Sequence, residues 1–179
     1  MLVITMTEKI VIWENPIMDK VYLELDRKIQ ASEKIEKPTF KDNECYPLNT
    51  KNIIKILQLF ASKKILVRYG TAFFKNNDYW KVNLENSKNL PEYLRKNRKS
   101  LHRLVYAVYY GIPQAIIAKD YHIHHLCGNP CCMNPLHMFG VHGMKHKAVE
   151  WITEKLRKEK KSYSEMKYIL RIKLNKGEL

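Results

Sequence analysis

The feature of this sequence that most constrains its fold is a segment, residues 121–150, that is crowded with residues able to bind metal ions. It contains three of the four cysteines and six of the seven histidines. Cys127, Cys132 and His137 follow one another at equal spacing, and structural zinc takes four ligands of these types. The loop that contains Asn129-Pro130 and Asn134-Pro135 has no periodic apolar pattern, so zinc binding can supply the folding energy that a core would otherwise supply.

The fourth ligand of such a zinc site has to come from outside the evenly spaced set. Cys45 is the only distant cysteine, and His124 and His142 are alternatives closer in sequence. Cys131 does not fit the spacing, and we interpret it as a small buried apolar side chain. Since neighbouring Cys131 and Cys132 can hardly serve separate crosslinks, the cysteines indicate a metal site and not a disulfide framework.

The charge of the chain indicates its partner. The formal net charge is +14, and the excess lies outside the first part of the chain. Residues 1–44 hold 7 Lys/Arg and 9 Asp/Glu, whereas residues 45–179 hold 25 and 9. Such a one-sided excess attracts polyanions and gives salt-dependent binding. We expect nucleic acid as the partner; a lysine-rich surface without a ligand is the alternative.

The sequence shows no membrane or secretion signal. No apolar run reaches the roughly 20 residues needed to cross a bilayer. The N-terminus MLVITMTEKI lacks the basic start and the long apolar core of a signal peptide. We therefore expect an intracellular protein, in the cytoplasm or the nucleus of a host, that is neither secreted nor bound to a membrane.

Hydrophobic periodicity predicts several helices and one sheet. Apolar residues recur at helical spacing over residues 16–32, 49–60, 91–110, 143–160 and 161–179. Between residues 63 and 84, short apolar runs separated by turn-forming residues predict an antiparallel meander. Together these elements predict an α+β protein.

The last strand of this meander alternates apolar side chains with side chains that carry hydrogen-bond donors or a flat ring. The second set consists of Tyr79, Lys81 and Asn83. With Arg68 and Lys75, it can lie in the major groove of DNA, which accommodates a two-stranded ribbon. A half-solvated sheet without a ligand shows the same alternation and is the alternative.

Two histidines that flank the expected zinc loop are candidates for catalysis. Alternation along a strand places His125 on one face and His122 and His124 on the other, so His125 can point into a cleft alone. His146 falls in the helix predicted from residue 143. A zinc-held hairpin packed on that helix would bring His125 and His146 together.

The order His125-Leu-Cys127, Cys132, Asn134-Pro135-Leu-His137 and His146 resembles the HNH, or ββα-metal, endonucleases. The closest resemblance is to the His-Cys box homing endonucleases and the zinc-loop HNH nucleases of phages. It covers about residues 100–150 and extends weakly to Cys45-Tyr46, which matches the cysteine and tyrosine that complete the first zinc site of the His-Cys box family. It implies a zinc-stapled ββα-metal core whose structural zinc is bound by Cys45, Cys127, Cys132 and His137.

The resemblance also implies a reaction, the hydrolysis of DNA phosphodiester bonds to a 5′-phosphate and a 3′-hydroxyl. His125 is then the general base, since neutral imidazole can take a proton from water near pH 7. His146 is then the ligand of a catalytic Mg²⁺ ion, which offsets charge on the phosphate. Asn134 is expected to bridge backbone groups and fix the loop. His102-Arg103 matches a His-Arg pair of the family, with Arg103 as a phosphate contact and His102 in a structural role.

The sequence departs from the His-Cys box pattern in three places. No cysteine follows Cys132, so the second zinc site of that family is absent. Position 146 is His where those enzymes have Asn, although other HNH nucleases use His there. His142 stands where a Ser or Thr would cap the following helix.

The sequence thus predicts a site-specific DNA endonuclease of homing or phage type. Its expected parts are an N-terminal extension (1–44), a DNA-binding sheet and helix (45–115), the nuclease core (116–160) and a helical tail (161–179). We expect double-stranded DNA as the partner and a homodimer, because one active site cuts one strand. A monomeric nickase, a nuclease directed at RNA and a zinc-dependent DNA-binding regulator with an inactive nuclease centre are the alternatives.

Overall fold

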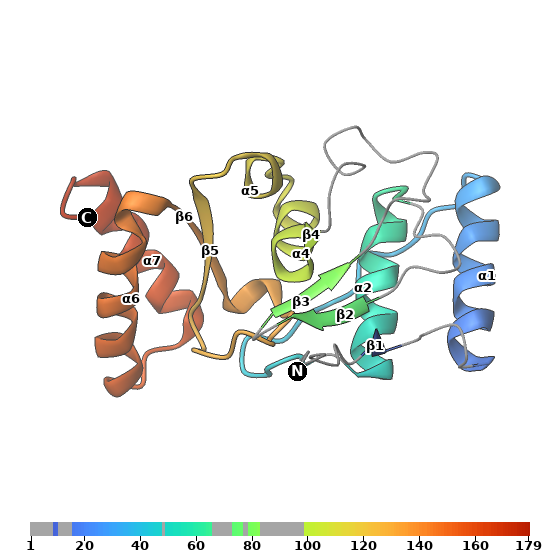
Figure 1. The fold of residues 1–179 in the computed structure, drawn as a ribbon, viewed down its shortest axis with the longest axis horizontal. Coiled ribbons are helices and arrows are strands. Elements are labelled where there is room, and N and C mark those ends of the chain that lie inside the picture. Colours follow the sequence, from blue (N-terminus) through green and yellow to red (C-terminus); the bar gives the residue numbers. More distant parts are fainter. Residues whose placement is uncertain (1–8, 11–15, 48, 66–72, 77–78, 83–98) are drawn as a thin grey trace, which may run out of the picture. The chain divides into compact units, whose positions relative to one another are not determined.

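The chain forms two compact units, each made of two stretches of sequence. The computed structural model describes residues 9–10, 16–47, 49–65, 73–76, 79–82 and 99–179 (Figure 1). The first unit contains Met1–Pro38 and Asn49–Leu101, and the second contains Thr39–Leu48 and His102–Leu179. All four cysteines and all seven histidines of the chain belong to the second unit. Helices and antiparallel strands occur together, which confirms the expected α+β class.

The first unit contains two helices that pack on each other, α1 (Pro16–Gln30) and α2 (Thr50–Ser62). The helix α2 begins after Asn49, whose side chain accepts a hydrogen bond from the backbone N–H of Asn52 at 3.0 Å. This bond satisfies one of the donors that a helix start leaves free. One face of α2 is buried at helical spacing, through Ile53, Ile56, Leu57, Leu59 and Phe60. Both helices lie close to their predicted ranges.

The first unit also contains a sheet of four antiparallel strands in the order β1-β2-β3-β4. The strands are β1 (Lys9–Ile10), β2 (Phe73–Asn76), β3 (Tyr79–Val82) and β4 (Lys99–Ser100). The pairing of Asn76 with Tyr79 joins β2 to β3, as expected for the predicted meander. The side chains expected to face DNA are not described: Arg68 and Asn83 lie outside the described residues, and only the backbone of Lys75, Tyr79 and Lys81 is described.

The helix predicted over residues 91–110 is wrong at its start. Helix α4 spans Leu101–Tyr110, and the two residues before it form β4. The backbone of β4 pairs with β3, with Ser100 opposite Lys81 and Lys99 opposite Val82. Pairing with a neighbouring strand therefore overrides the local helix preference of this basic run. Residues 83–98 lie outside the described part of the chain.

The second unit is organised around a two-stranded hairpin. Strand β5 (Tyr121–His125) pairs with β6 (Met138–His142), with His124 opposite Phe139 and His122 opposite Val141. Helix α6 (Gly143–Lys158) continues directly from β6 and packs on both strands, and α7 (Tyr163–Asn175) packs on α6 (Figure 1). The core between them consists of Leu126, Phe139, Val141, Val149, Leu156, Met166 and Leu170. Burial of each such side chain stabilises the unit by about 1.5–3 kcal/mol.

The opposite face of the hairpin meets α4 and the short helix α5 (Gln114–Ile117). The backbone N–H of Gly140 in β6 donates a hydrogen bond to the Tyr106 hydroxyl of α4 at 3.1 Å. A Cβ atom at Gly140 would overlap the Tyr121 hydroxyl, so the close packing here requires glycine. Among the described residues, no helix has both the length and the apolar character needed to cross a membrane.

Candidate metal centre and histidine cluster

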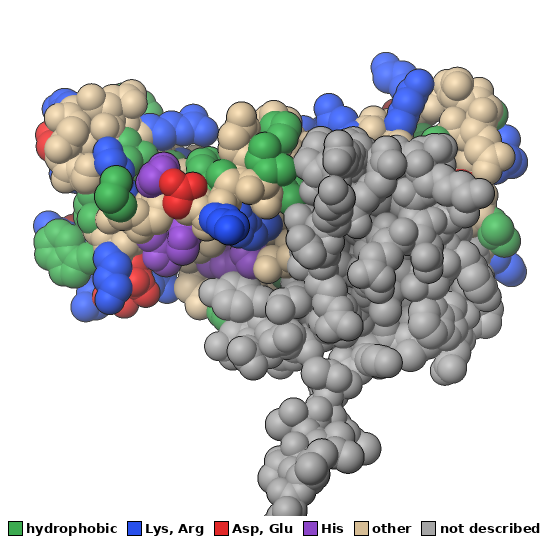
Figure 2. All heavy atoms as spheres, turned by 45° about the horizontal axis from the view of Figure 1, so that its top comes forward, with side chains coloured by type: hydrophobic (Ala, Val, Ile, Leu, Met, Phe, Trp, Pro, Cys, Tyr) green, Lys and Arg blue, Asp and Glu red, His purple; other side chains and the backbone are tan. Residues whose placement is uncertain are grey.

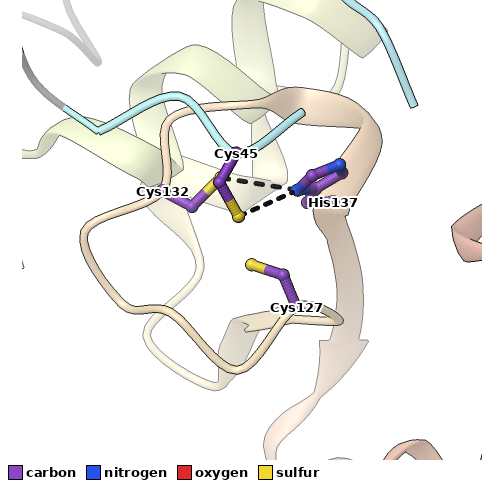
Figure 3. Close-up of side chains that lie close together, drawn as sticks. All are labelled: Cys45, Cys127, Cys132 and His137. Atoms are coloured by element: carbon purple, nitrogen blue, oxygen red, sulfur yellow. Dashed lines mark hydrogen bonds between the residues drawn. The ribbon is translucent and has the colours of Figure 1, made fainter. Parts of the chain in front are cut away.

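The second unit brings the four predicted zinc ligands together. One ligand atom from each of Cys45, Cys127, Cys132 and His137 can be chosen so that all lie within 4.8 Å of one another (Figure 3). The His137 Nδ1 atom lies 3.7 Å from the Cys45 Sγ atom and 3.5 Å from the Cys132 Sγ atom. Tetrahedral zinc with Zn–S about 2.3 Å and Zn–N about 2.0 Å separates S from N by about 3.5 Å. These residues can therefore hold a metal ion, and their spacing is compatible with structural zinc.

The ligands come from separate parts of the second unit. Cys127 lies in the turn after β5 and Cys132 in the following loop. His137 lies in the short 3-10 helix η2 (Pro135–His137), and Cys45 comes from the segment 39–48. The other candidates for the fourth ligand lie elsewhere: His124 faces α6, and the Nε2 atom of His142 lies 2.6 Å from a carboxylate oxygen of Asp120.

Hydrogen bonds around the site favour metal binding. The Nε2 atom of His137 lies 2.7 Å from the carbonyl oxygen of Asp42. Because a carbonyl can only accept, Nε2 carries the proton and the lone pair of Nδ1 faces the sulfur atoms. The pKa of the Cys132 thiol is lowered, most by a hydrogen bond from Cys127 and further by the backbone N–H groups of Asn134 and Tyr46. A thiolate, the form that binds zinc, is therefore favoured at Cys132.

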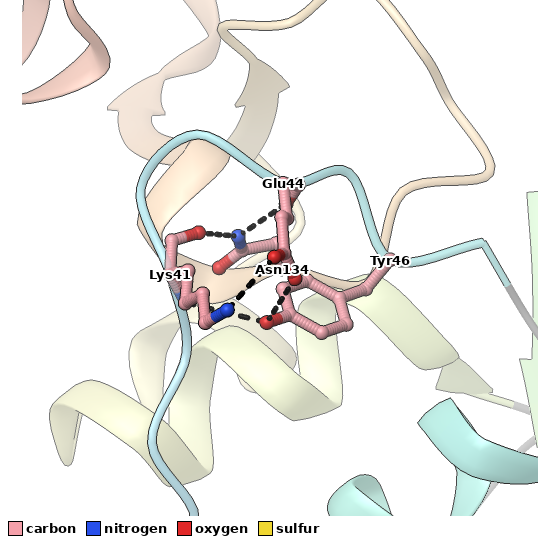
Figure 4. Close-up of polar contacts among 4 residues, drawn as sticks. All are labelled: Lys41, Glu44, Tyr46 and Asn134. Atoms are coloured by element: carbon pink, nitrogen blue, oxygen red, sulfur yellow. Dashed lines mark hydrogen bonds and ion pairs between the residues drawn. The ribbon is translucent and has the colours of Figure 1, made fainter.

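Asn134 ties the Cys45 segment to the metal loop. Its side chain is fully buried, and its Nδ2 atom donates to the carbonyl oxygens of Lys41 and Glu44, both at 2.7 Å (Figure 4). Its Oδ1 atom accepts from the backbone N–H of Leu136 at 3.0 Å. These are bridges between backbone groups, the role that the family resemblance implied. Asn134 is thus a positioning residue in this structure.

Arg103 also binds backbone groups. Its guanidinium donates to the carbonyl oxygens of Ala115, Ala118 and Tyr121, and so joins α4 to α5 and to the start of β5. The pKa of Arg103 is lowered by burial. These bonds give the side chain a structural role, and a contact with phosphate stays a prediction.

His146 contacts a different histidine from the one expected. Its ring centroid lies 5.2 Å from that of His122 and 5.4 Å from that of His124. His125 instead lies with its ring centroid 5.0 Å from that of His102 in α4. Since side chains alternate along a strand, His125 and His146 lie on opposite faces of β5. The prediction that these two rings converge is therefore wrong, because α6 covers the face that carries His122 and His124.

His124, like His122, was not assigned to catalysis from the sequence. Its side chain is 9% exposed, and among the described residues its Nε2 atom has no hydrogen-bond partner. Burial lowers the pKa of His124 to about 4, with smaller contributions from His146, His125 and Arg157. The register could have indicated this placement, because His124 is paired with the apolar Phe139, whose face a helix has to cover.

The histidine cluster, defined as His122, His124 and His146, reaches the surface of the second unit. His122 is exposed and His146 is half-buried. Figure 2 shows histidine side chains gathered on one face, with Lys and Arg side chains near them. Burial also lowers the pKa of His146, so neutral imidazoles that can accept a cation are favoured here.

His125 has its own polar partner. Its side chain is 6% exposed, and its Nε2 atom lies 3.2 Å from the carbonyl oxygen of Cys132. Because the carbonyl accepts, Nε2 carries the proton and Nδ1 carries the lone pair. Burial lowers the pKa of this imidazole.

Comparison of the chain with protein-family models, with curated proteins and with solved structures finds no match.

Proposed function

We propose that the second unit is a metal-dependent DNA endonuclease of the HNH, or ββα-metal, kind, related to the His-Cys box homing endonucleases and the phage zinc-loop nucleases. The observation that carries the proposal is a pair of neighbouring imidazoles, His124 of β5 and His146 of α6, in the same unit as a Cys3His cluster. In this proposal the Cys3His cluster holds structural zinc, and His146 belongs to a separate catalytic centre that uses Mg²⁺.

The donor set of the histidine cluster suits a divalent ion completed by other ligands. His124 and His146 supply nitrogen atoms from one strand and one helix. We include His124 because its buried Nε2 atom otherwise has no partner among the described residues. Mg²⁺ prefers oxygen, so its remaining ligands would be oxygen atoms of DNA and water. When bound, such an ion offsets the charge that develops on the phosphate.

The resemblance assigns the general base to His125, although its ring contacts His102 of α4 and lies on the face of β5 away from His146, so the cleavage tests below decide whether it acts on the same phosphate. Its Nε2 atom lies 3.2 Å from the Cys132 carbonyl oxygen, which orients the ring, and a neutral imidazole can take a proton from water. The net charge of +14 favours a polyanionic substrate, and double-stranded DNA cut by a homodimer is the specific form of the proposal.

Cleavage of a supercoiled plasmid tests the proposal. The zinc-loaded protein should nick or linearise the plasmid with Mg²⁺ and should leave it intact when Mg²⁺ is omitted. His125→Ala should keep DNA binding and cut at least a hundredfold more slowly, within the range of a lost general base. Added imidazole should restore part of this activity, which it would not do for a merely structural histidine. His142→Ala, on the same hairpin and exposed, is the matched control and should cut normally.

Two outcomes would overturn the proposal. Undiminished cutting by His125→Ala would show that His125 is not the general base. Undiminished cutting by His146→Ala would show that His146 does not bind the catalytic Mg²⁺. Binding of duplex DNA without any cleavage would favour a zinc-dependent DNA-binding regulator. The burial of His125, on the face of β5 away from His146, is the observation that favours this second candidate.

A further inference from the structure

The guanidinium of Arg157 lies directly over the backbone of the metal loop. Arg157 is in the last turn of α6, and a Cβ atom added at Gly128 would overlap its Nη1 atom. Gly128 has φ +72°, a conformation that L side chains rarely adopt. Because Gly128 has no side chain, the guanidinium of Arg157 occupies the position that a Cβ atom of residue 128 would take.

Arg157 is held there without a hydrogen-bond acceptor. Within the described part of the chain, its guanidinium makes no hydrogen bond and no ion pair, although it is half-buried. Glu154 lies three residues earlier on the same helix, within reach of an ion pair, and the arginine does not use it. The donors of a guanidinium form a rigid fork that matches two oxygens of a phosphate. Since no described residue accepts these hydrogen bonds, an added phosphate can take them.

Arg157 shares one side of α6 with the histidine cluster. His146, Thr153 and Arg157 are separated by seven and four residues, which places them on one face of the helix. Thr153 is fully buried, so this face is the one that packs on the hairpin. Arg157 and His146 both contribute to lowering the pKa of His124, so His124 lies within electrostatic range of both. The free donors of Arg157 and the proposed catalytic centre thus belong to the same side of the helix.

We propose that Arg157, seated over Gly128, binds a phosphate group of a nucleic-acid backbone next to the histidine cluster. The inference rests on the proposed function for the source of that phosphate, namely DNA. It goes beyond that function because it assigns the anion contact to a residue outside the HNH-like segment. Arg157 is then a substrate-binding residue, and Gly128 is the residue that positions it.

Side-chain NMR tests the contact without any cleavage. The Nε–Hε resonance of Arg157, identified by its loss in Arg157→Gln, is followed while inorganic phosphate and then a short DNA duplex are added to the zinc-loaded full chain without Mg²⁺. We expect a saturable shift with both ligands. We also expect Arg157→Gln to weaken duplex binding and to lower the slope of log affinity against log salt by about one.

Control variants separate a phosphate contact from a structural role. Lys158→Gln removes an exposed cation from the same turn and should leave the Arg157 shift intact. Arg157→Lys keeps the charge without the fork and should bind duplex with intermediate affinity. Gly128→Ala should abolish the Arg157 shift; if this variant loses zinc, the two Arg157 variants decide alone.

The inference and the nuclease proposal fail in different ways. An Arg157 resonance that stays fixed while phosphate and duplex bind elsewhere overturns the inference. So does an Arg157→Gln variant that loses zinc but keeps the affinity and salt dependence of duplex binding. Duplex binding with the expected Arg157 shift, but without cleavage when Mg²⁺ is added, leaves the inference standing and removes the nuclease.

Discussion

The imidazoles of His124 and His146 lie 5.4 Å apart between ring centroids, with their planes at 72°. One ring belongs to a strand and the other to the helix packed on it, so their spacing depends on the contact between β5 and α6. The Nε2 atom of His124 is buried there without a partner among the described residues. An unsatisfied buried nitrogen costs about 1–3 kcal/mol, so this arrangement is one that a ligand can stabilise.

Acid should destabilise the protein partly through His124. Its pKa is about 4 in the folded chain and 6.5 as the ordinary value, mainly because it is buried. The unfolded chain therefore takes up this proton first, and stability falls as the pH drops from 6.5 to 4, by about 3 kcal/mol at most. His124→Phe should remove this part of the loss. Urea unfolding at pH 7 and pH 5, with zinc content measured in each sample, checks it; equal pH dependence in both proteins would contradict the prediction.

Substitution of a cysteine should cause loss of zinc only where that cysteine is a ligand of the metal centre. Cys127→Ser and Cys132→Ser each remove a thiolate ligand and should lose bound zinc, which also lowers the thermal stability of the second unit. Cys131→Ser is the matched control, because Cys131 lies outside the four-residue cluster. Metal analysis of the purified variants, followed by thermal unfolding with and without added zinc, measures both effects. Zinc loss in Cys131→Ser alone would show that the ligand set is different.

Asn134→Ala should loosen the segment that carries Cys45. The substitution removes the hydrogen bonds that the carbonyl oxygens of Lys41 and Glu44 accept from Asn134, which costs about 1–3 kcal/mol for the two together. Asn43→Ala removes an exposed asparagine from the same segment and should change the free energy of unfolding by less than about 0.5 kcal/mol. Denaturant unfolding of the zinc-loaded variants measures both values. Similar losses in the two variants would show that the bridge contributes nothing specific.

The half-buried Lys167 should contribute more to the stability of the folded protein at alkaline pH. Its Nζ atom donates to the Tyr110 hydroxyl at 2.8 Å and to the Pro135 carbonyl oxygen at 3.4 Å, and burial lowers its pKa to about 8. The unfolded chain keeps this proton up to about pH 10.5, so the contribution of Lys167 to stability rises between pH 8 and 10.5. The stability of the wild type relative to Lys167→Met should therefore increase with pH over this range. Lys176→Met, at an exposed site, should show no such trend.

The ligand set was predictable from sequence because coordination chemistry restricts it. Zinc requires four soft ligands, and the equal spacing of Cys127, Cys132 and His137 left few choices for the fourth. Helix α6 was predictable from the helical spacing of Ala148, Trp151, Ile152 and Leu156. The predicted stripe was wrong in part, because Trp151 is exposed and the buried residues are Val149, Thr153 and Leu156. For the evenly spaced ligands and for α6 the information is local in the chain, whereas Cys45 was assigned through the family resemblance.

Two other predictions needed information that is not local. Alternation showed that His125 and His124 point to opposite faces of a strand, but the choice of the face that α6 covers depends on packing. The apolar side chains of Phe139 and Val141 make that choice, since they join the core with Leu156 and Val149. The predicted start of α4 was wrong for the same reason, because residues 99 and 100 pair with β3, which comes earlier in the chain.

The position of Cys45 in the sequence determines when the metal site can form during biosynthesis. Cys45 and His137 are 92 residues apart, and the stretch Asn49–Leu101 of the first unit is synthesised between them. Because the chain is synthesised from its N-terminus, Cys45 cannot complete the metal site until His137, the last ligand in the sequence, has left the ribosome. The segments of the second unit on either side of this stretch must then come close enough for one ion to bind all four ligands. A different sequence could replace that stretch and leave the centre intact, provided that its ends meet in the same way.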